Sequence, residues 1–400
     1  MSDTIEESSI PVGFSFSSAI AGIKASGRPD LALIEAALGT TAAGLFTRNL
    51  VVAAPVVVGR AALAKSRGKV RAVIVNSGNA NCATGIAGVH AARKVCIELA
   101  RLLGTRSSEV FPSSTGIIGV PIPADKIIAK LPELFATRSP DAAAANKFAA
   151  TILTTDTHPK TASATFRLGN KRVRLLGIAK GSGMIHPQLA TMLVYLMTDI
   201  AANPTQLRQY LKAACADSFE CISVDGDTST NDTVLLLASG KSDVSVRSAE
   251  KPFTKALQSL CQSLAEQIVK DGEGVQHVIH LSIQQAKNRE EALQIARAIS
   301  HSVLVKTAWA GADPNWGRIL AAIGRSGIAV DPKQLSIHIG DQTVCRRGAA
   351  FPFDQTEAHK HLSQPDCNIG IRLGRGRAKI KFITTDLTTE YVRINADYST

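Results

Sequence analysis

Thr191 is the side chain of this sequence best placed to act as a nucleophile. It follows KGSGMIHPQLA, residues 180–190, whose glycines and proline indicate an irregular loop, and it begins the apolar run TMLVYLMTDI, residues 191–200. A loop that ends on a buried strand can hold one hydroxyl in a fixed position, as covalent catalysis requires. Taken alone, the segment has an alternative interpretation, in which the threonine simply begins a strand.

A second candidate group lies in FPSSTGIIG, residues 111–119. Here the hydroxyl of Thr115 and the amide of Gly116 are adjacent, and we expect them on a tight turn. Two donors that point to one place can stabilise the negative charge of a tetrahedral intermediate, so the pair is a candidate oxyanion hole. An ordinary serine/threonine turn is the competing interpretation.

Three further polar segments interrupt the apolar pattern. VNSGNANC, residues 75–82, follows a predicted strand and reads as a strand-to-helix turn with an asparagine cap, or as backbone that approaches a ligand closely. SVDGDTSTNDT, residues 223–233, lacks the glutamate of a calcium loop, so a hydrogen-bonded network that supports the next strand is preferred. In GADPNWGR, residues 311–318, we expect an Arg–Asp brace beside a packed Trp316, with carboxylate recognition by Arg318 as the alternative.

Several common site motifs are missing from the sequence. Neither GxxxxGK[ST], nor GxGxxG in a βαβ context, nor GxSxG occurs, so nucleotide binding and a serine hydrolase elbow have no support. His359 and His361 could bind a metal, but they lie in a polar segment, residues 346–367, that we expect to be a loop without strong ligand spacing. No metal or cofactor is predicted.

The elements that must position these groups alternate between β and α patterns. Apolar, β-branched runs predict strands at residues 71–76, 173–178, 191–200, 233–238, 277–283 and 379–384. Amphipathic spacing predicts helices at 86–103, 205–219, 254–270 and 289–307, and 142–150 is Ala-rich, as helices are; a further loop is expected at 238–252. This alternation indicates layered α/β structure, in one large domain or two associated ones.

Composition limits the function classes. The 400 residues are 45% hydrophobic and carry a net charge of +12, but the basic residues are scattered, and the run from Arg372 to Lys379 has no neighbouring aromatics, so no nucleic-acid partner is predicted. Seven cysteines without a CxxC pair suggest buried thiols, not disulfides or zinc. The N-terminal segment lacks signal features, and the best apolar run, 50–58, contains Pro55. We therefore expect a cytoplasmic protein with no membrane segment.

Taken together, the motifs resemble those of the ornithine acetyltransferase family, the glutamate N-acetyltransferases of arginine biosynthesis (ArgJ-type). The resemblance runs over nearly the whole chain. It is carried by SSTGIIG, ILTTDT, KGSGM..P..ATML, VDGDTSTNDTVLL, DGEG, VKTA..GADPNWGRI.AAIGRSG and YVRINADYST. It implies a layered α/β sandwich with mixed sheets, as in DmpA- and ArgJ-like proteins.

The resemblance also implies a mechanism. Such proteins cut themselves between the residues matching Ala190 and Thr191, which gives fragments 1–190 and 191–400 that both contribute to the sandwich. The new α-amine of Thr191 would serve as general base for its own hydroxyl. The acetyl group of N-acetylornithine would pass through Thr191 to glutamate, and the family leaves open acetyl-CoA as a second donor. The implied assembly is a heterotetramer of two α and two β fragments.

Site residues carried over from the family motifs are the oxyanion pair Thr115 and Gly116 and six substrate contacts. The six are Thr154, Lys180, Thr191, Glu273, Asn395 and Thr400. Lys180 would hold the α-carboxylate and Glu273 the ammonium of ornithine. The sequence departs from the family pattern at 111–112, 275–277 and 309–310; the second departure lies beside Glu273 and bears on the shape of the amine end. The alternative function is a self-processed N-terminal-nucleophile aminopeptidase or amidohydrolase, which would use the same nucleophile with water as acceptor.

Overall fold

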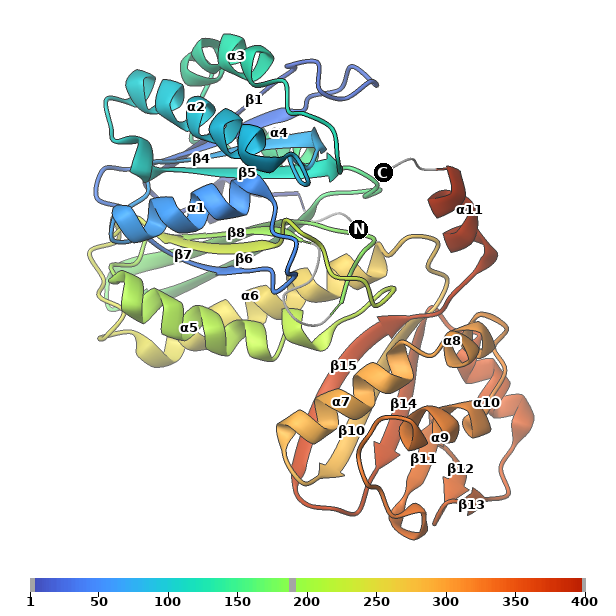
Figure 1. The fold of residues 1–400 in the computed structure, drawn as a ribbon. Coiled ribbons are helices and arrows are strands. Elements are labelled where there is room, and N and C mark those ends of the chain that lie inside the picture. The colour runs from blue at the N-terminus through green and yellow to red at the C-terminus, as the bar shows by residue number, and fades with distance from the viewer. Residues whose placement is uncertain (1–3, 187–191, 398–400) are drawn as a thin grey trace.

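The computed structural model describes residues 4–186 and 192–397. They form two bodies, a sandwich of two sheets between helices and a smaller C-terminal module, residues 278–385 (Figure 1). The fold is therefore α/β with layered, mixed sheets, as the sequence predicted. Among the described residues, no helix is long and apolar enough to cross a bilayer.

The first layer of the sandwich is a four-stranded sheet in the order β1-β2-β4-β5. Its strands are β1 (Phe14–Ala19), β2 (Leu31–Ala36), β4 (Ala72–Asn79) and β5 (Val110–Ile117). β4 and β5 are parallel, and the other pairs are antiparallel. Helices α2 (Gly85–Leu103) and α3 (Ala124–Ala136) pack their apolar faces on its outer side. The loop after β5 therefore opens at the same edge as the end of β4.

The second layer is a five-stranded sheet in the order β3-β9-β8-β7-β6. Its strands are β3 (Thr41–Phe46), β9 (Thr233–Ala238), β8 (Leu193–Thr198), β7 (Lys171–Lys180) and β6 (Lys160–Leu168). Helices α5 (Pro204–Ala216) and α6 (Glu250–Lys270) cover its outer face. Asn203 caps α5 and forms a reciprocal capping box with Gln206, which explains why the helix begins at Pro204.

The core of the sandwich lies between the two sheets. Phe16, Ile34 and Val75 of the first sheet meet Ile178 and Tyr195 of the second, and all are fully or almost fully buried. β8 and β9 are buried at every position because helices cover one face and the other sheet covers the opposite face. Helices α1 (Ala54–Lys65) and α4 (Ala142–Thr151) pack beside β5 and β1.

The C-terminal module contains a six-stranded sheet in the order β13-β12-β11-β14-β10-β15. Its strands are β10 (Val278–Ala286), β11 (Ser336–Ile339), β12 (Gln342–Arg346), β13 (Ala349–Ala350), β14 (Asp366–Arg372) and β15 (Ala378–Thr385). Along β14, buried Cys367, Ile369 and Ile371 alternate with more exposed residues, so one face of this sheet holds the core. Its helices are α7 (Arg289–Ser300), α8 (Val303–Ala310), α9 (Trp316–Gly324) and α10 (Gln355–Leu362).

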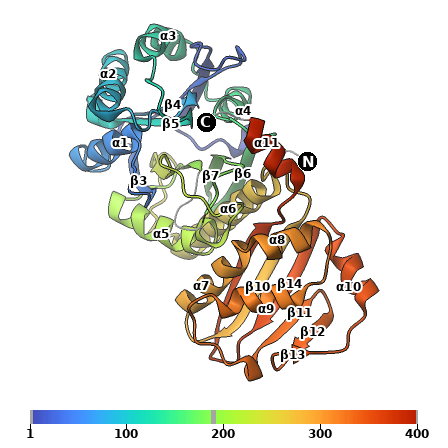
Figure 2. The same ribbon diagram turned by 45° about the vertical axis from the view of Figure 1, so that its right-hand side comes forward.

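The remaining elements are short 3-10 turns and the last helix. The turns are η1 (Glu7–Ser9), η2 (Ser107–Glu109), η3 (Phe219–Cys221) and η4 (Pro332–Gln334). Helix α11 (Thr389–Asp397) leaves β15 and returns toward the sandwich (Figures 1 and 2). The predicted strands and helices match observed ones except at the positions described next, and all seven cysteines are free and buried, as expected.

Two element predictions were wrong in the C-terminal module. The helix predicted over 289–307 is two helices, α7 and α8, broken at His301 and Ser302, where the His301 ring turns to contact Ser223 and His186. The loop predicted over 346–367 contains β13 and α10. Asp354 caps α10 by accepting from the amides of residues 356 and 357, while Ala358 and Leu362 reach the core.

Two predicted turns are strand instead. The segments 75–82 and 111–119 lie largely in β4 and β5, which pair in parallel through Asn76–Ser114 and Ser77–Thr115. Several of their buried polar side chains have hydrogen-bond partners: Ser114 bonds to Asn76 at 2.6 Å, and Ser77 and Asn81 donate to backbone carbonyls. The oxyanion candidates therefore lie at the end of a strand and not on a tight turn.

Candidate active site

One pocket of about 100 Å³ brings together most of the residues singled out in the sequence. Its lining includes Thr115, Gly116, Thr154, Lys180, Glu273 and Asn395, which come from β5, the loop after α4, β7, the loop after α6, and α11. Ala190, Thr191 and Thr400 lie outside the described residues. Leu193, two positions after Thr191 in the sequence, pairs with Lys180, which lines this pocket.

The oxyanion candidates occupy a backbone position that only glycine accepts. Gly116 has φ of 130°, and a Cβ atom there would collide with the carbonyl carbon of Gly78 in β4. Its neighbour Thr115 is buried, and its hydroxyl faces the ammonium of Lys180 at 3.3 Å. The close contact between β4 and β5 therefore holds the amide and the hydroxyl side by side at the wall of the pocket.

Asn231 supports this pair from the second half of the chain. Its side-chain amide donates to the carbonyls of Ala80, at 2.7 Å, and Ser114, at 2.9 Å. Because Ser114 precedes Thr115, these bonds hold the oxyanion strand against the loop before β9. This confirms the predicted network in residues 223–233. No sequence pattern singles out Asn231 within that network, because both partners lie more than 100 positions away.

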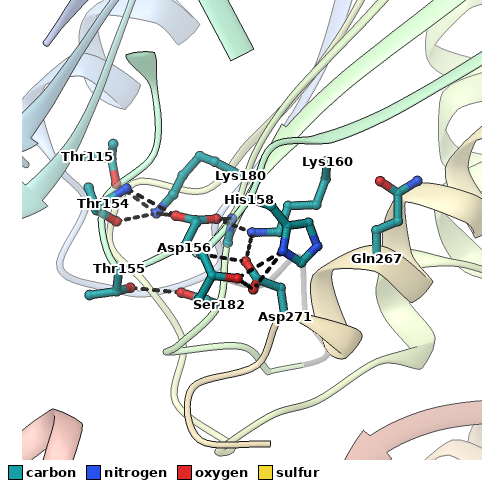
Figure 3. Close-up of polar contacts among 12 residues, drawn as sticks. Thr115, Thr154, Thr155, Asp156, His158, Lys160, Lys180, Ser182, Gln267 and Asp271 are labelled. Carbon is teal, nitrogen blue, oxygen red and sulfur yellow. Dashed lines mark hydrogen bonds and ion pairs between the residues drawn. The ribbon is translucent and has the colours of Figure 1, made fainter. Parts of the chain in front are cut away.

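Lys180 is the central cation of the site (Figure 3). Its side chain is buried, and its Nζ atom donates to Thr154 Oγ1 at 2.9 Å and lies 3.6 Å from Asp156 Oδ2. The ammonium thus bridges the oxyanion threonine and the loop after α4. Among the described residues that line this pocket, Lys180 is the one with a positive charge, and this charge suits an anionic substrate group.

Behind Lys180 lies a cluster of four buried charges: Asp156, Lys160, Lys180 and Asp271 (Figure 3). Lys160 Nζ donates to Asp156 Oδ1 at 2.6 Å and also to Asp271, and the Gly181 amide donates to Asp156. Burial alone would raise the pKa of Asp156, but the charges of Lys180 and Lys160 hold that pKa well below its usual range. Asp156 is in the motif ILTTDT, yet sequence reasoning selected only Thr154 from it.

The other end of the pocket is acidic. Asn395 Nδ2 donates to Glu273 Oε2 at 2.9 Å, so α11 holds the carboxylate in place. Gly183 lies against that carboxylate so closely that a Cβ atom would strike it. Nearby, burial raises the pKa of Asp225 to about 6 despite hydrogen bonds from the amides of Asp227 and Met184. Glu273 therefore gives this end of the pocket a carboxylate that suits a cationic group.

The segment just after Thr191 is anchored to the same wall. The amide of Met192 donates to Asp232 Oδ1 at 3.1 Å, and the Met192 carbonyl accepts from Thr233. Burial raises the pKa of Asp232 well above its usual range. Strand β8 thus starts from a fixed point next to the loop that carries Asn231.

Two other sequence candidates lie elsewhere. Arg318 donates to the Leu304 carbonyl at 2.8 Å. Within the described residues it does not form the predicted contact with an aspartate and does not line the pocket. Trp316 is partly buried against the core of the C-terminal module. His359 forms a hydrogen bond with the Ala312 carbonyl, and His361 forms one with the backbone of Asn368, so each imidazole has a partner within the protein.

Comparison with known proteins identifies the family. The model of the ArgJ family matches residues 15–400. The arginine biosynthesis bifunctional protein ArgJ of Methylococcus capsulatus is 43% identical over 97% of this chain and 95% of its own length. The solved structure of the Bacillus halodurans protein of the same name is 40% identical, covers 51% of this chain and 98% of its own, and has a TM-score of 0.49. The ornithine acetyltransferase of Mycobacterium tuberculosis, solved with ornithine, is 36% identical, covers 46% of this chain and 96% of its own, and has a TM-score of 0.40. The chain belongs to the ArgJ family.

Proposed function

We propose that this protein transfers the acetyl group of N2-acetyl-L-ornithine to L-glutamate. The observation that carries the proposal is the single pocket with an oxyanion pair, Thr115 and Gly116, a cation, Lys180, and a carboxylate, Glu273. An N-acetylated α-amino acid with a side-chain ammonium needs those three kinds of partner. The name of the Methylococcus capsulatus relative, arginine biosynthesis bifunctional protein ArgJ, supports that assignment.

The nucleophile proposed is Thr191, set free by cleavage of the Ala190–Thr191 bond. The Thr191 hydroxyl would attack the Ala190 carbonyl, which exchanges the amide for an ester, and water would then hydrolyse the ester. The products would be fragments 1–190 and 191–400, the second with a free α-amine. An α-amine has a pKa of about 7.7–8.0, so it can accept the hydroxyl proton near neutral pH, whereas an amide nitrogen cannot.

Two half-reactions would then follow at the same hydroxyl. Thr191 Oγ would attack the acetyl carbonyl of N-acetylornithine, and the ornithine amine would leave with the proton held by the Thr191 α-amine. Glutamate would next attack the acetyl-threonine ester through its α-amine, giving N-acetylglutamate and restoring the hydroxyl. The negative charge of each tetrahedral intermediate would fall between the Thr115 hydroxyl and the Gly116 amide.

Both substrates share an α-carboxylate and differ in the side chain. Lys180 would hold the carboxylate, with Thr154 fixing the lysine. Glu273, held by Asn395, would take the ammonium of ornithine, and the segment from Asn395 to Thr400 would close the pocket. Closure matters because water that reached the acetyl ester would hydrolyse it. Use of acetyl-CoA as donor and assembly into a heterotetramer belong to the same proposal on family grounds.

Intact-mass analysis of the purified protein and of Thr191→Ala tests the processing step. We expect two fragments from the wild type and one inactive chain from the variant. A single uncut wild-type chain with full activity would refute the proposed nucleophile.

The transfer step is tested by measuring ornithine release with and without glutamate. Release should depend on glutamate. If it is equally fast without glutamate, the protein is a hydrolase of the aminopeptidase type that uses water as acceptor.

A further inference from the structure

A groove of about 700 Å³ lies away from the candidate active site, on the opposite edge of the five-stranded sheet from β6. Its lining residues come mainly from the edge strand β3, from α1 and from α5, and Figure 2 shows β3 between these two helices. Its rim carries four cationic side chains and one acidic side chain: Arg48, Arg60, Arg208, Lys212 and Glu220. The volume is in the range of sites for small metabolites.

The four cations lack a carboxylate partner in the part of the chain that the structure describes. Within residues 4–186 and 192–397, none of them forms an ion pair, and Glu220, which also lines the groove, forms none either. Arg208 and Lys212 lie four positions apart on α5, a spacing at which like charges repel one another. The groove thus concentrates positive charge that the described residues do not neutralise.

Two of the arginines are fixed in place by other contacts. Arg60 donates to the Thr47 carbonyl at 2.8 Å and lies over the Phe46 ring, and Arg208 donates to the Gly44 carbonyl at 3.2 Å. Each guanidinium has further N–H groups that can bind an oxyanion in a forked geometry. Arg60 and Arg208 are therefore held at the groove, and each has N–H donors that remain available.

The groove does not suit an added peptide strand. On the open edge of β3, the Ala42 amide already donates to the Gly68 carbonyl, and the Gly44 carbonyl already accepts from Arg208. A strand that paired with β3 would have to displace both bonds. A small anion needs only the side-chain donors, so the geometry favours a small molecule over a polypeptide.

We infer that this groove binds a small polyvalent oxyanion, a molecule with two or more phosphate or carboxylate groups, in contact with Arg48, Arg60, Arg208 and Lys212. A chain of hydrogen bonds connects this groove to the catalytic region. Thr47, which Arg60 holds, donates through its hydroxyl to the Ser229 carbonyl at 2.6 Å and through its amide to the Asp232 carbonyl. Ser229 lines the candidate active site. The inference does not depend on the proposed acetyl transfer.

Titration calorimetry with tripolyphosphate and with citrate, at low ionic strength, tests the inference on the full chain. The groove variant is Arg48→Gln/Lys212→Gln, since neither side chain makes a hydrogen bond within the described residues. The matched control, Lys379→Gln/Lys381→Gln, removes the same charge from exposed positions on β15. We expect one anion per wild-type chain, affinity at least about tenfold weaker in the groove variant, and a change below about twofold in the control.

Comparison of the two anions tells which group the site prefers; binding of either supports the site. Lys180→Met, shown to be folded by circular dichroism under the conditions of the titration, serves as the second control, because anion binding in the catalytic pocket would be lost with that lysine. The inference is overturned if the wild type binds neither anion at about 1 mM. It is also overturned if both double variants weaken equally, or if Lys180→Met abolishes binding.

Discussion

Replacing Asp156 with asparagine should destabilise the sandwich strongly, because it unbalances the buried charge cluster. Asp156, Lys160, Lys180 and Asp271 carry two negative and two positive charges, and their side chains are at most 5% exposed. The asparagine side chain would keep the shape but lose the charge. The two lysines would then share one carboxylate, which leaves one buried positive charge without compensation.

The magnitude follows from the contacts that lose their charge. Asp156 accepts from Lys160 at 2.6 Å and from the Gly181 amide, and it lies 3.6 Å from Lys180. Breaking a buried ion pair by removing one partner costs about 3–5 kcal/mol of unfolding free energy. The double variant Asp156→Asn/Lys160→Met restores neutrality, so its loss should fall short of the sum of the single losses by roughly 1–3 kcal/mol.

Urea unfolding followed by far-UV circular dichroism measures these losses. Both tryptophans, Trp309 and Trp316, lie in the C-terminal module, so their fluorescence reports the module separately. The matched control is Asp125→Asn, whose partner Lys94 lies at 2.7 Å with both side chains exposed, and its loss of unfolding free energy should be far smaller than that of Asp156→Asn. The reasoning is refuted if Asp156→Asn costs no more than the control, or if the double-variant losses are additive.

Three further predictions concern the pocket. Thr115→Val should lower kcat by about 10²–10³-fold with little change in KM. Thr155→Val, which changes another threonine of the same lining, should leave kcat nearly unchanged. If both variants lose the same factor in kcat in steady-state assays, Thr115 does not have the oxyanion role. Glu273→Gln should raise KM for N-acetylornithine about tenfold and KM for glutamate far less, and a parallel rise in both would contradict the assignment. The pKa of Asp225 is raised to about 6 in the folded protein, so the folded state holds this proton more tightly than the unfolded state does. The resulting contribution to the unfolding free energy is complete below about pH 4 and is lost as the pH rises through 6. Between pH 4 and 7, the Tm of Asp225→Asn should therefore fall less with rising pH than the Tm of the wild type. Identical slopes of Tm against pH would refute the raised pKa of Asp225.

Much of the fold could be predicted because the strand patterns are strong. The run at residues 233–238 is apolar at nearly every position and corresponds to β9 with the same limits. The helix predicted over 289–307 is interrupted at His301 and Ser302, where the ring of His301 contacts Ser223, far away in sequence. The spacing of apolar residues along a sequence, from which the helix was predicted, does not reveal such a contact.

The candidate site was predictable where a residue lies in a distinctive motif, and less so where its role comes from partners. Lys180 and Glu273 lie in such motifs, and they do line one pocket. Asp271 lies in the motif DGEG but was not selected, because its partner Lys160 is 111 positions away. Asn231 was missed for the same reason, since hydrogen bonds across the sandwich give an ordinary polar residue its importance.

The strand order of the five-stranded sheet has a consequence for a chain cut before residue 191. Strands β9 and β8, from the second piece, lie between β3 on one side and β7 and β6 on the other, all from the first piece. The two pieces would therefore be joined by two strand pairings, β3 with β9 and β7 with β8, and neither piece could separate without breaking both. A nicked molecule would then migrate as one particle on a native sizing column and come apart only in denaturant.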